Sequence, residues 1–295
     1  MPSLRDLAEL VRAPAALSVP GDVVAGAAAA DALDRRVPGL AGASVLLYWA
    51  GMAANDWADR ELDAKERPER PIPSGRVSPG FALGVSAGLT AAGIGLAGLA
   101  GGRRALAVAV PLAGAVWAYD LRAKNTPAGP AVMAACRGLD VLLGASGGRV
   151  ARAVPAALTV AAHTYTVTEL SRREVSGATR ALPAATLAGT AAVAAAAVAR
   201  PRTADPAAAS GSPNWRTLVP AALAGWYGLQ YGAAQARVAA DPQASKVRAA
   251  VGAGITGLPA LQGALVARAG AAVLGVAVAA AAPLGRRLAR LVSPT

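Results

Sequence analysis

The chain has 295 residues, of which 55% are hydrophobic and 16% are charged, and its mean hydropathy is +0.42. Soluble domains carry about 25% charged residues, so this composition excludes an ordinary soluble protein. The net charge of +12 does not indicate a nucleic-acid partner, because the basic residues lie between apolar runs, where membrane topology and anionic lipid headgroups account for them. A single cysteine, Cys136, excludes an intrachain disulfide and a cysteine-based zinc site.

Several apolar runs reach the length of about 20 residues that is needed to cross a lipid bilayer. Backbone polar groups inside lipid are satisfied only in helices or in closed barrels. The runs are rich in Ala, Leu and Val and show no alternation of period two, so helices are expected. The sequence therefore predicts an all-α fold, a polytopic membrane bundle that forms one domain over residues 1–295.

The expected elements follow one another along the whole chain. Residues 1–12 have an amphipathic pattern that is typical of a segment on the membrane surface. The apolar spans are expected at about 13–30 (kinked at Pro20), 39–57, 79–99, 103–119, 128–147, 153–171, 181–199 and 215–238, with one or two more within 246–285. Residues 200–214 show no helical pattern. Nine and ten spans both remain open, since Arg286, Arg287 and Arg290 favour an even number.

The Lys and Arg residues are divided unevenly between the two sides of this arrangement. About 19 of the 29, with Arg137 counted among them, lie on the side of the N-terminus, of the loops after the second, fourth and sixth spans and of the region around Lys246. The positive-inside rule places that side in the cytoplasm. We therefore expect a multi-pass cell-membrane protein whose polar loops, and any site that they form, face the cytoplasm.

Residues 55–76 form the most polar of these loops and hold six of the chain's 17 acidic residues. At about 100° per residue, Asp56, Asp59 and Asp63 fall on one helical face with Asn55 at its edge. Carboxylates at such spacing repel one another and need a compensating cation. Magnesium is a hard ion that commonly binds one or two carboxylates together with substrate phosphates, so the loop predicts a Mg²⁺ site.

The pattern N-D-x-x-D-x-x-x-D followed by R-P-x-P-S-G resembles the first aspartate-rich motif of the UbiA superfamily of intramembrane prenyltransferases. The matching residues are Asn55, Asp56, Asp59, Asp63, Arg70, Pro71, Pro73, Ser74 and Gly75. The resemblance implies about nine transmembrane helices around a central cavity. It also implies Mg²⁺-dependent transfer of a prenyl group from an allylic prenyl diphosphate to an unidentified acceptor, aromatic or polar.

In this interpretation the acidic residues Asp56, Asp59 and Asp63 are catalytic, and Asn55, Asp59 and Asp63 hold the magnesium. The metal and nearby basic side chains neutralise the diphosphate, whose departure leaves an allylic carbocation. The substrate-binding set then includes Asn55 and a group of residues with cationic or phenolic side chains, namely Arg67, Arg70, Tyr119, Arg122 and Lys124.

Tyr119, Arg122 and Lys124 resemble a Y-x-x-x-x-K loop of the family. Arg67 and Arg70 offer planar guanidinium groups that can bond two phosphate oxygens at once. A cytoplasmic excess of basic residues would also account for the four Lys and Arg positions without any binding role. Both interpretations stay open at this level.

A second polar cluster departs from the family pattern, in which D-x-x-x-D precedes a glycine. Alignment on Gly177 puts Glu169 at the first acidic position and Arg173 at the second, with Glu174 beside it. Either Arg173 and its neighbour Arg172 contact the diphosphate and one metal is lost, or Glu169 and Glu174 share a metal. A charged helix end without a functional role is the third possibility.

Arg137 and Asp140 lie inside the fifth apolar span, where ionisable groups are costly and are usually paired or functional. Their spacing of three residues allows a mutual contact on a helix. We expect them to bind a polar acceptor or the diphosphate. The string around them, C-R-G-L-D-V-L-L-G, is similar to the EboC-like bacterial branch of the superfamily. His163, the one histidine, is more typical of a structural residue than of a general base.

Three other functions fit the same sequence. A UbiA-type terpene cyclase would use the same metal site and quench the carbocation internally. An enzyme that transfers a sugar phosphate to a polyprenyl phosphate would bind the diphosphate of a sugar. A membrane protein without catalytic activity is the remaining alternative, and the altered cluster around Arg173 is the best argument for it.

Overall fold

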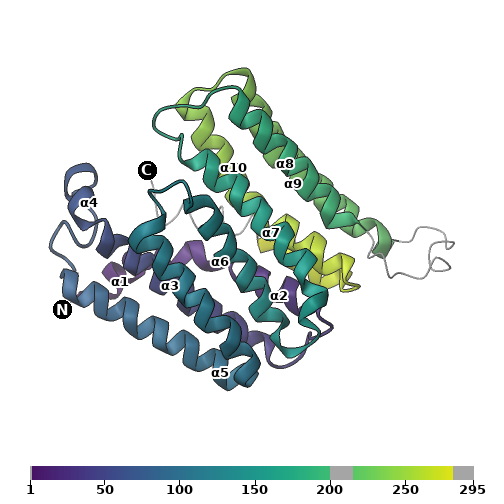
Figure 1. Cartoon of the computed structure of the whole chain (residues 1–295), viewed down its shortest axis with the longest axis horizontal. Coiled ribbons are helices and arrows are strands. Elements are labelled where there is room, and N and C mark those ends of the chain that lie inside the picture. The colour runs from purple at the N-terminus through teal and green to yellow at the C-terminus, as the bar shows by residue number, and fades with distance from the viewer. Residues whose placement is uncertain (1, 200–214, 282–295) are drawn as a thin grey trace.

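The computed structural model describes residues 2–199 and 215–281, and in these residues the chain is a bundle of helices without strands (Figure 1). The expected all-α fold is therefore confirmed. The helices, in chain order, are α1 (Leu4–Leu10), η1 (Ala13–Ser18), α2 (Pro20–Ala29), α3 (Val37–Ala58), α4 (Arg60–Glu66), α5 (Pro79–Ala118), η2 (Tyr119–Ala123), α6 (Gly129–Gly144), η3 (Ala145–Gly147), α7 (Val150–Ser171), α8 (Ala181–Val198), α9 (Trp215–Ala240) and α10 (Ala244–Arg268). A short apolar helix follows at Ala272–Ala281.

Four of the described helices are long and apolar enough to cross a membrane by length and composition alone. They cover Val37–Ala58, Pro79–Ala123, Ala181–Val198 and Ala244–Arg268. The choice between nine and ten spans depends on residues after 281, and the three arginines that favour an even number lie outside the described residues. The predicted loop at 200–214 lies outside them as well.

Glycine and proline interrupt the helices at two of the expected positions. Gly102 has a φ of 64°, a left-handed conformation that breaks α5 between the predicted spans 79–99 and 103–119. Pro20 is the first residue of α2, directly after the 3₁₀ helix η1, and proline is well tolerated in the first turn of a helix. The expected kink at Pro20 is therefore a helix start.

Two apolar clusters hold the bundle together. Side chains of α3, α5 and α6 form one of them, around Leu40, Leu47 and Leu143. Side chains of α7, α8, α9 and α10 form the other, which contains the fully buried Tyr227 and Tyr231. Figure 1 shows α8 and α9 side by side at one edge of the bundle and α3 and α5 at the other, with α6 and α7 between them.

His163 belongs to the second of these clusters. Its Nδ1 atom lies 2.8 Å from the Tyr227 hydroxyl, and its ring packs edge-on against Tyr227 and Tyr231. The His163 side chain is 2% exposed. The histidine is thus a packing residue, as the sequence favours.

Helices α2 and α6 approach each other closely because glycine stands at their contact. A Cβ atom on Gly26 would lie 1.7 Å from the carbonyl oxygen of Val141, and one on Gly144 would lie 2.0 Å from that of Val23. Small residues allow such close packing of membrane helices. The contact matters for the site, since it brings Asp22 of α2 to the polar face of α6.

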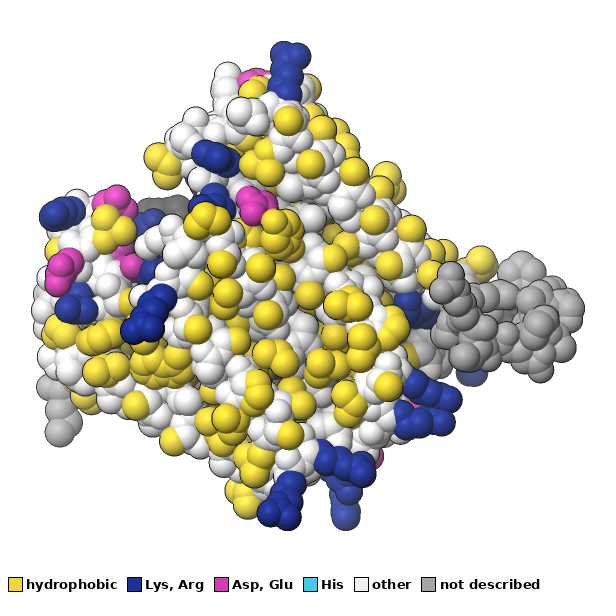
Figure 2. Space-filling view, viewed as in Figure 1, with side chains coloured by type: hydrophobic (Ala, Val, Ile, Leu, Met, Phe, Trp, Pro, Cys, Tyr) yellow, Lys and Arg dark blue, Asp and Glu magenta, His cyan; other side chains and the backbone are white. Residues whose placement is uncertain are grey.

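The outer surface is apolar between two charged ends. Figure 2 shows Lys, Arg, Asp and Glu side chains gathered toward opposite edges of one face, while yellow and white atoms cover the area between them. Large apolar side chains such as Leu99, Leu158 and Leu229 are 65–88% exposed. Exposed apolar surface of this extent marks a membrane-facing region rather than a solvated one.

Candidate active site

The polar stretch 55–76 is divided by a helix break at Asp59, which ends α3 and begins α4 with a φ of −90° and a ψ of 2°. The predicted single face of carboxylates is therefore wrong. Asn55 and Asp59 point to one set of partners, and Asp56 and Asp63 point to another. The reason is that the helix does not continue through Asp59, and that different cations and loops approach its two sides.

The first set joins the end of α3 to the π-helix η2. The Asn55 side-chain amide donates a hydrogen bond to Asp120 Oδ1 at 3.2 Å, and Lys124 Nζ lies 2.6 Å from Asp59 Oδ1. Asp120 is 3% exposed. A π-turn adds one residue to the helical turn, and such turns are frequent at functional sites. Here it turns both Asp120 and Lys124 toward the end of α3.

Arg70 holds the second set together. Its Nη1 atom lies 2.7 Å from Asp63 Oδ2 and 3.3 Å from Asp56 Oδ1. Arg12, which precedes η1, adds a second cation, with its Nη2 atom 2.7 Å from the same Asp56 oxygen. Arg67 lies further from Asp63, at 3.7 Å, and is half exposed. Each carboxylate of the predicted motif is thus neutralised by a basic side chain.

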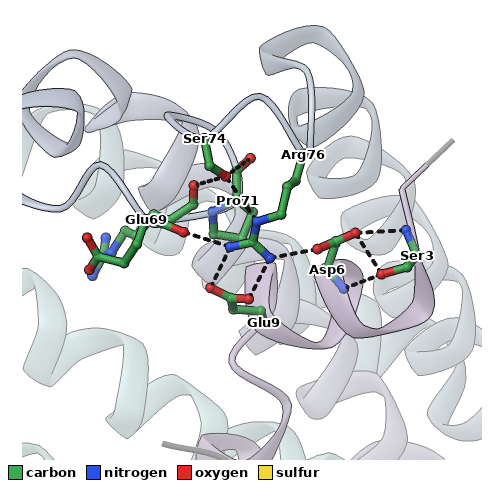
Figure 3. A network of polar contacts seen from close by, with 8 residues as sticks. Ser3, Asp6, Glu9, Glu69, Pro71, Ser74 and Arg76 are labelled. Atoms are coloured by element: carbon green, nitrogen blue, oxygen red, sulfur yellow. Dashed lines mark hydrogen bonds and ion pairs between the residues drawn. The ribbon is translucent and has the colours of Figure 1, made fainter. Parts of the chain in front are cut away.

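The N-terminal helix α1 is fastened to the loop that follows α4 (Figure 3). Arg76 lies 2.6 Å from Asp6 Oδ1 and 2.8 Å from Glu9 Oε2 through its Nη1 atom. Asp6 also forms a capping box with Ser3. The Ser3 hydrogen bonds and then Arg76 lower the pKa of Asp6 to about 2, and the two carboxylates raise the pKa of Arg76. The amphipathic segment predicted at residues 1–12 therefore covers the polar loop.

A cavity of about 80 Å³ opens below the first set. Its walls come from η1–α2, α3, α5, η2 and α6, and its lining residues are Val19, Ser44, Leu47, Tyr48, Gly51, Met52, Leu112, Val116, Tyr119, Asp120, Met133, Cys136, Arg137 and Asp140. Tyr119 and Asp120 stand at the end next to Asn55. Apolar side chains line the middle, and Ser44, Arg137 and Asp140 form the inner end.

The two ionisable residues inside the fifth span have different surroundings. Arg137 Nε lies 2.8 Å from Asp22 Oδ2 of α2, and Gln262 of α10 donates a hydrogen bond of 2.6 Å to the other Asp22 oxygen. Asp140 is 4% exposed and neither of its oxygens has a hydrogen-bond partner. Arg137 therefore pairs with Asp22, and the mutual contact expected between Arg137 and Asp140 does not form an ion pair.

The second polar cluster lies at the same end of the bundle but is less closely joined. Arg172 Nη1 donates a hydrogen bond of 2.7 Å to the carbonyl of Thr126, in the loop that follows η2. Glu174 is partly buried, which raises its pKa, while the charges of Arg248 and Arg67 oppose that shift. The charge of Arg67 thus acts on Glu174 as well as on Asp63.

The other two members of the second cluster lie apart from the cavity. Glu169 is in the last turn of α7, where its carboxylate interacts with the Tyr165 hydroxyl. Arg173 is exposed and forms no ion pair with any described residue. Arg122 likewise is exposed and has no ion pair among the described residues.

The chemistry of the donor set fits a magnesium ion, although the described residues contain no group of three or more Asp, Glu, His or Cys side chains that could hold one alone. Asn55, Asp59 and Asp120 offer carboxylate and amide oxygens at one end of the cavity. Magnesium usually binds through one or two carboxylates and completes its coordination with water and substrate phosphates. The second cluster adds no carboxylate to this set.

Three residues of the site were missed from the sequence. The sequence predicts Asp120 as part of a loop, Asp22 as part of the first span and Arg12 as part of a surface segment. For Asp22 a signal was present, because it is an acid in an apolar run, as Asp140 is. No pattern in the sequence indicates that Arg12 reaches Asp56.

Comparisons with known proteins bear on this arrangement. The model of the UbiA prenyltransferase family matches residues 18–199. A digeranylgeranylglyceryl phosphate synthase of Methanopyrus kandleri is 46% identical over 77 residues, which are 26% of this chain and 28% of the relative. The corresponding synthase of Halobacterium salinarum is 38% identical over 169 residues, or 52% of this chain and 58% of the relative. The chain thus spans less than two thirds of these relatives.

Two solved structures share the fold over most of their length. A structure of a digeranylgeranylglyceryl phosphate synthase has a TM-score of 0.66 and 18% identity, and the match covers 90% of this chain and 98% of that one. A UbiA homologue from Aeropyrum pernix K1, solved without ligands, has a TM-score of 0.63 and 19% identity, with 88% and 96% covered.

Proposed function

This chain belongs to the UbiA prenyltransferase family, and we propose that it transfers a prenyl group from an allylic prenyl diphosphate to a polar acceptor inside the membrane. The observation that carries the proposal is that Asp120 lines an apolar cavity and is hydrogen-bonded by Asn55 at the end of α3, where Asp59 pairs with Lys124. Such a site binds a diphosphate at its polar end and an isoprenoid chain below it. The names of the relatives support an isoprenoid donor.

Each residue of the first set has a role in this proposal. Asn55, Asp59 and Asp120 would hold a magnesium ion, which neutralises the departing diphosphate when it is bound. Lys124 pairs with Asp59 in the structure, and it would bind a phosphate oxygen when the diphosphate is present. Tyr119 stands at the same end of the cavity.

The second set orients the first. Arg70 fixes Asp56 and Asp63 against each other, and its guanidinium has free N–H groups that are suited to phosphate. Asp56 and Asp63 would therefore fix the shape of the loop through Arg70. Arg67 and Arg172 supply further positive charge at the rim.

The apolar middle of the cavity serves the chemistry that follows ionisation. An allylic cation is destroyed by water, and a cavity lined by Leu47, Leu112 and Val116 excludes it. The acceptor would enter the same cavity. We place the polar end of the bundle toward the cytoplasm, as the distribution of Lys and Arg indicates.

Diphosphate release tests the proposal. Detergent-purified protein is incubated with Mg²⁺ and with geranyl, farnesyl or geranylgeranyl diphosphate. We expect release from at least one donor, and a loss of at least about 100-fold for Asp59→Ala, because a proposed ligand of the magnesium ion is removed. Glu61→Ala is the matched control, since Glu61 is exposed and contacts only Arg60. Equal release by wild type and Asp59→Ala would contradict the proposal.

A further inference from the structure

The inner end of the cavity holds an acid that the fold leaves unpaired. Asp140 and Ser44 both line the cavity and are 4% and 2% exposed. Among the described residues, neither the two Asp140 oxygens nor the Ser44 hydroxyl has a hydrogen-bond partner. A buried polar group without a partner costs about 1–3 kcal/mol, so proteins rarely keep one without a reason.

The neighbouring cation is already used. Arg137 lies 2.8 Å from Asp22, its Nη2 atom donates to the carbonyl of Ser18 at 3.4 Å, and Gln262 donates to both Ser18 and Asp22. Arg137 and Asp22 therefore form a buried pair without net charge, which Gln262 completes. Asp140 is left without an ion-pair or hydrogen-bond partner among the described residues, and its place on the cavity wall lets a ligand reach it.

The position of this acid sets the geometry of its ligand. The face of α3 that lines the cavity runs from Met52 to Ser44, and eight residues of α-helix span about 12 Å. The face of α6 runs from Met133 to Asp140, and seven residues span about 10 Å. Asp140 therefore lies about 10 Å below the end where the diphosphate would bind. A group at Asp140 is too remote to act on the allylic carbon. The apolar end of an isoprenoid chain would leave the acid without a hydrogen-bond partner.

We propose that Ser44 and Asp140 form a recognition site for a hydroxyl group of the acceptor, about 10 Å from its nucleophilic end. A hydroxyl donates one hydrogen bond to Asp140 and accepts one from Ser44, which satisfies all three partners. Arg137 is a positioning residue that holds this face of α6 through Asp22. The inference rests on the proposed function, because it names the class of acceptor: a molecule with two polar ends and an apolar middle.

A pair of compounds that differ by one hydroxyl, and that carry no other O–H group, tests the proposal. The probes are 2-(4-methoxyphenyl)ethanol and 4-ethylanisole, and their dissociation constants are measured by calorimetry on the whole purified protein without donor. We expect the first to bind about tenfold tighter to wild type, which is the worth of about one hydrogen bond. In Asp140→Leu the ratio is expected to fall below about threefold.

The variants are chosen so that misfolding does not hide the answer. Asp140→Leu removes a buried acid without a partner, so its melting temperature is expected to equal or exceed that of wild type. If this variant does not fold, Asp140→Ala decides the question, because it also removes the acceptor oxygens, and the ratio is again expected to fall below about threefold. Asp34→Leu is the control, since Asp34 is exposed and outside the cavity.

Two outcomes would overturn the proposal: a wild type that binds both probes equally, or a preference that persists in the Asp140 variant. Neither depends on turnover. A protein that distinguishes the two probes but releases no diphosphate would keep this site and lose the proposed function. A protein that releases diphosphate but does not distinguish the probes would keep the proposed function and lose this site.

Discussion

Lys124 Nζ lies 2.6 Å from Asp59 Oδ1, although 65 residues separate them and each stands at the end of a different helix. The pair is mostly buried, with 13% and 23% of the side chains exposed. The charges of both residues act on Asp120, which lines the cavity. A lysine side chain that is held beside the site can change its partner and bind a diphosphate. This pair is therefore the centre of the proposed mechanism.

Removal of that cation is expected to impair the use of the donor. Lys124→Ala should lower kcat/KM for the prenyl diphosphate by about 100-fold or more, because a preorganised charge at the leaving group is lost. Arg122→Ala, two residues away, should change kcat/KM by less than about threefold, since Arg122 is exposed and has no ion pair within the described chain. Steady-state diphosphate release measures both. Equal losses in the two variants would contradict the assignment.

Arg70 is expected to be the main structural cation of the loop. Arg70→Ala leaves Asp56 and Asp63 side by side and nearly buried, which should destabilise the fold by about 2–4 kcal/mol. Arg60→Ala should cost less than about 1 kcal/mol, because Arg60 contacts the Trp57 ring and the exposed Glu61. Thermal unfolding in detergent compares them. A smaller shift for Arg70→Ala than for Arg60→Ala would refute this role.

Asp120 is expected to affect metal binding more than donor binding. In Asp120→Asn the concentration of Mg²⁺ that gives half-maximal diphosphate release should rise by at least about tenfold, since one carboxylate of the proposed set is lost. Binding of Mn²⁺, followed by electron paramagnetic resonance, should weaken in parallel without any donor present. Asp34→Asn is the control. Unchanged Mn²⁺ affinity in Asp120→Asn would remove Asp120 from the metal site.

The contact between α1 and the polar loop should depend on pH in the acid range. The pKa of Asp6 is about 2 in the fold, below its ordinary value of 3.8, because of Ser3 and then Arg76. A lowered pKa stabilises the contact above the unfolded value, so the stabilisation is complete above about pH 4 and is lost as the pH falls toward 2.

Limited proteolysis of α1 should therefore increase between pH 4 and pH 2, with an acid-active protease. Arg76→Ala should show the same exposure at neutral pH, because it removes the partner of both Asp6 and Glu9. Arg5→Ala, a charge change on the same helix, is the control. Equal protection of α1 in Arg76→Ala and wild type would show that the contact does not hold the helix.

The fold could be predicted from the sequence because it depends on a simple pattern. Long runs of Ala, Leu and Val must be helical in lipid, and Pro20 and Gly102 mark breaks that backbone chemistry requires. The loop 55–76 could be predicted as a site because its acids are concentrated between apolar runs. These features are local, so a single sequence contains them.

The pairing of the site residues depends on tertiary packing, which the sequence did not contain. The break at Asp59 separates the carboxylates into two sets, and a helical projection through that residue cannot anticipate it. The partner of Arg137 is Asp22 because glycines let α2 approach α6, and Asp140, three residues away on the same helix, was the nearer candidate.

One measurement tests the central claim most directly. Wild-type protein with Mg²⁺ is given geranylgeranyl diphosphate or its 2,3-dihydro analogue, which has the same length and headgroup but no allylic double bond. If the site ionises an allylic diphosphate, release from the first should exceed release from the second by at least about 100-fold, and should depend on Lys124. Equal release from the two compounds would show phosphate hydrolysis without carbocation chemistry and would contradict the account.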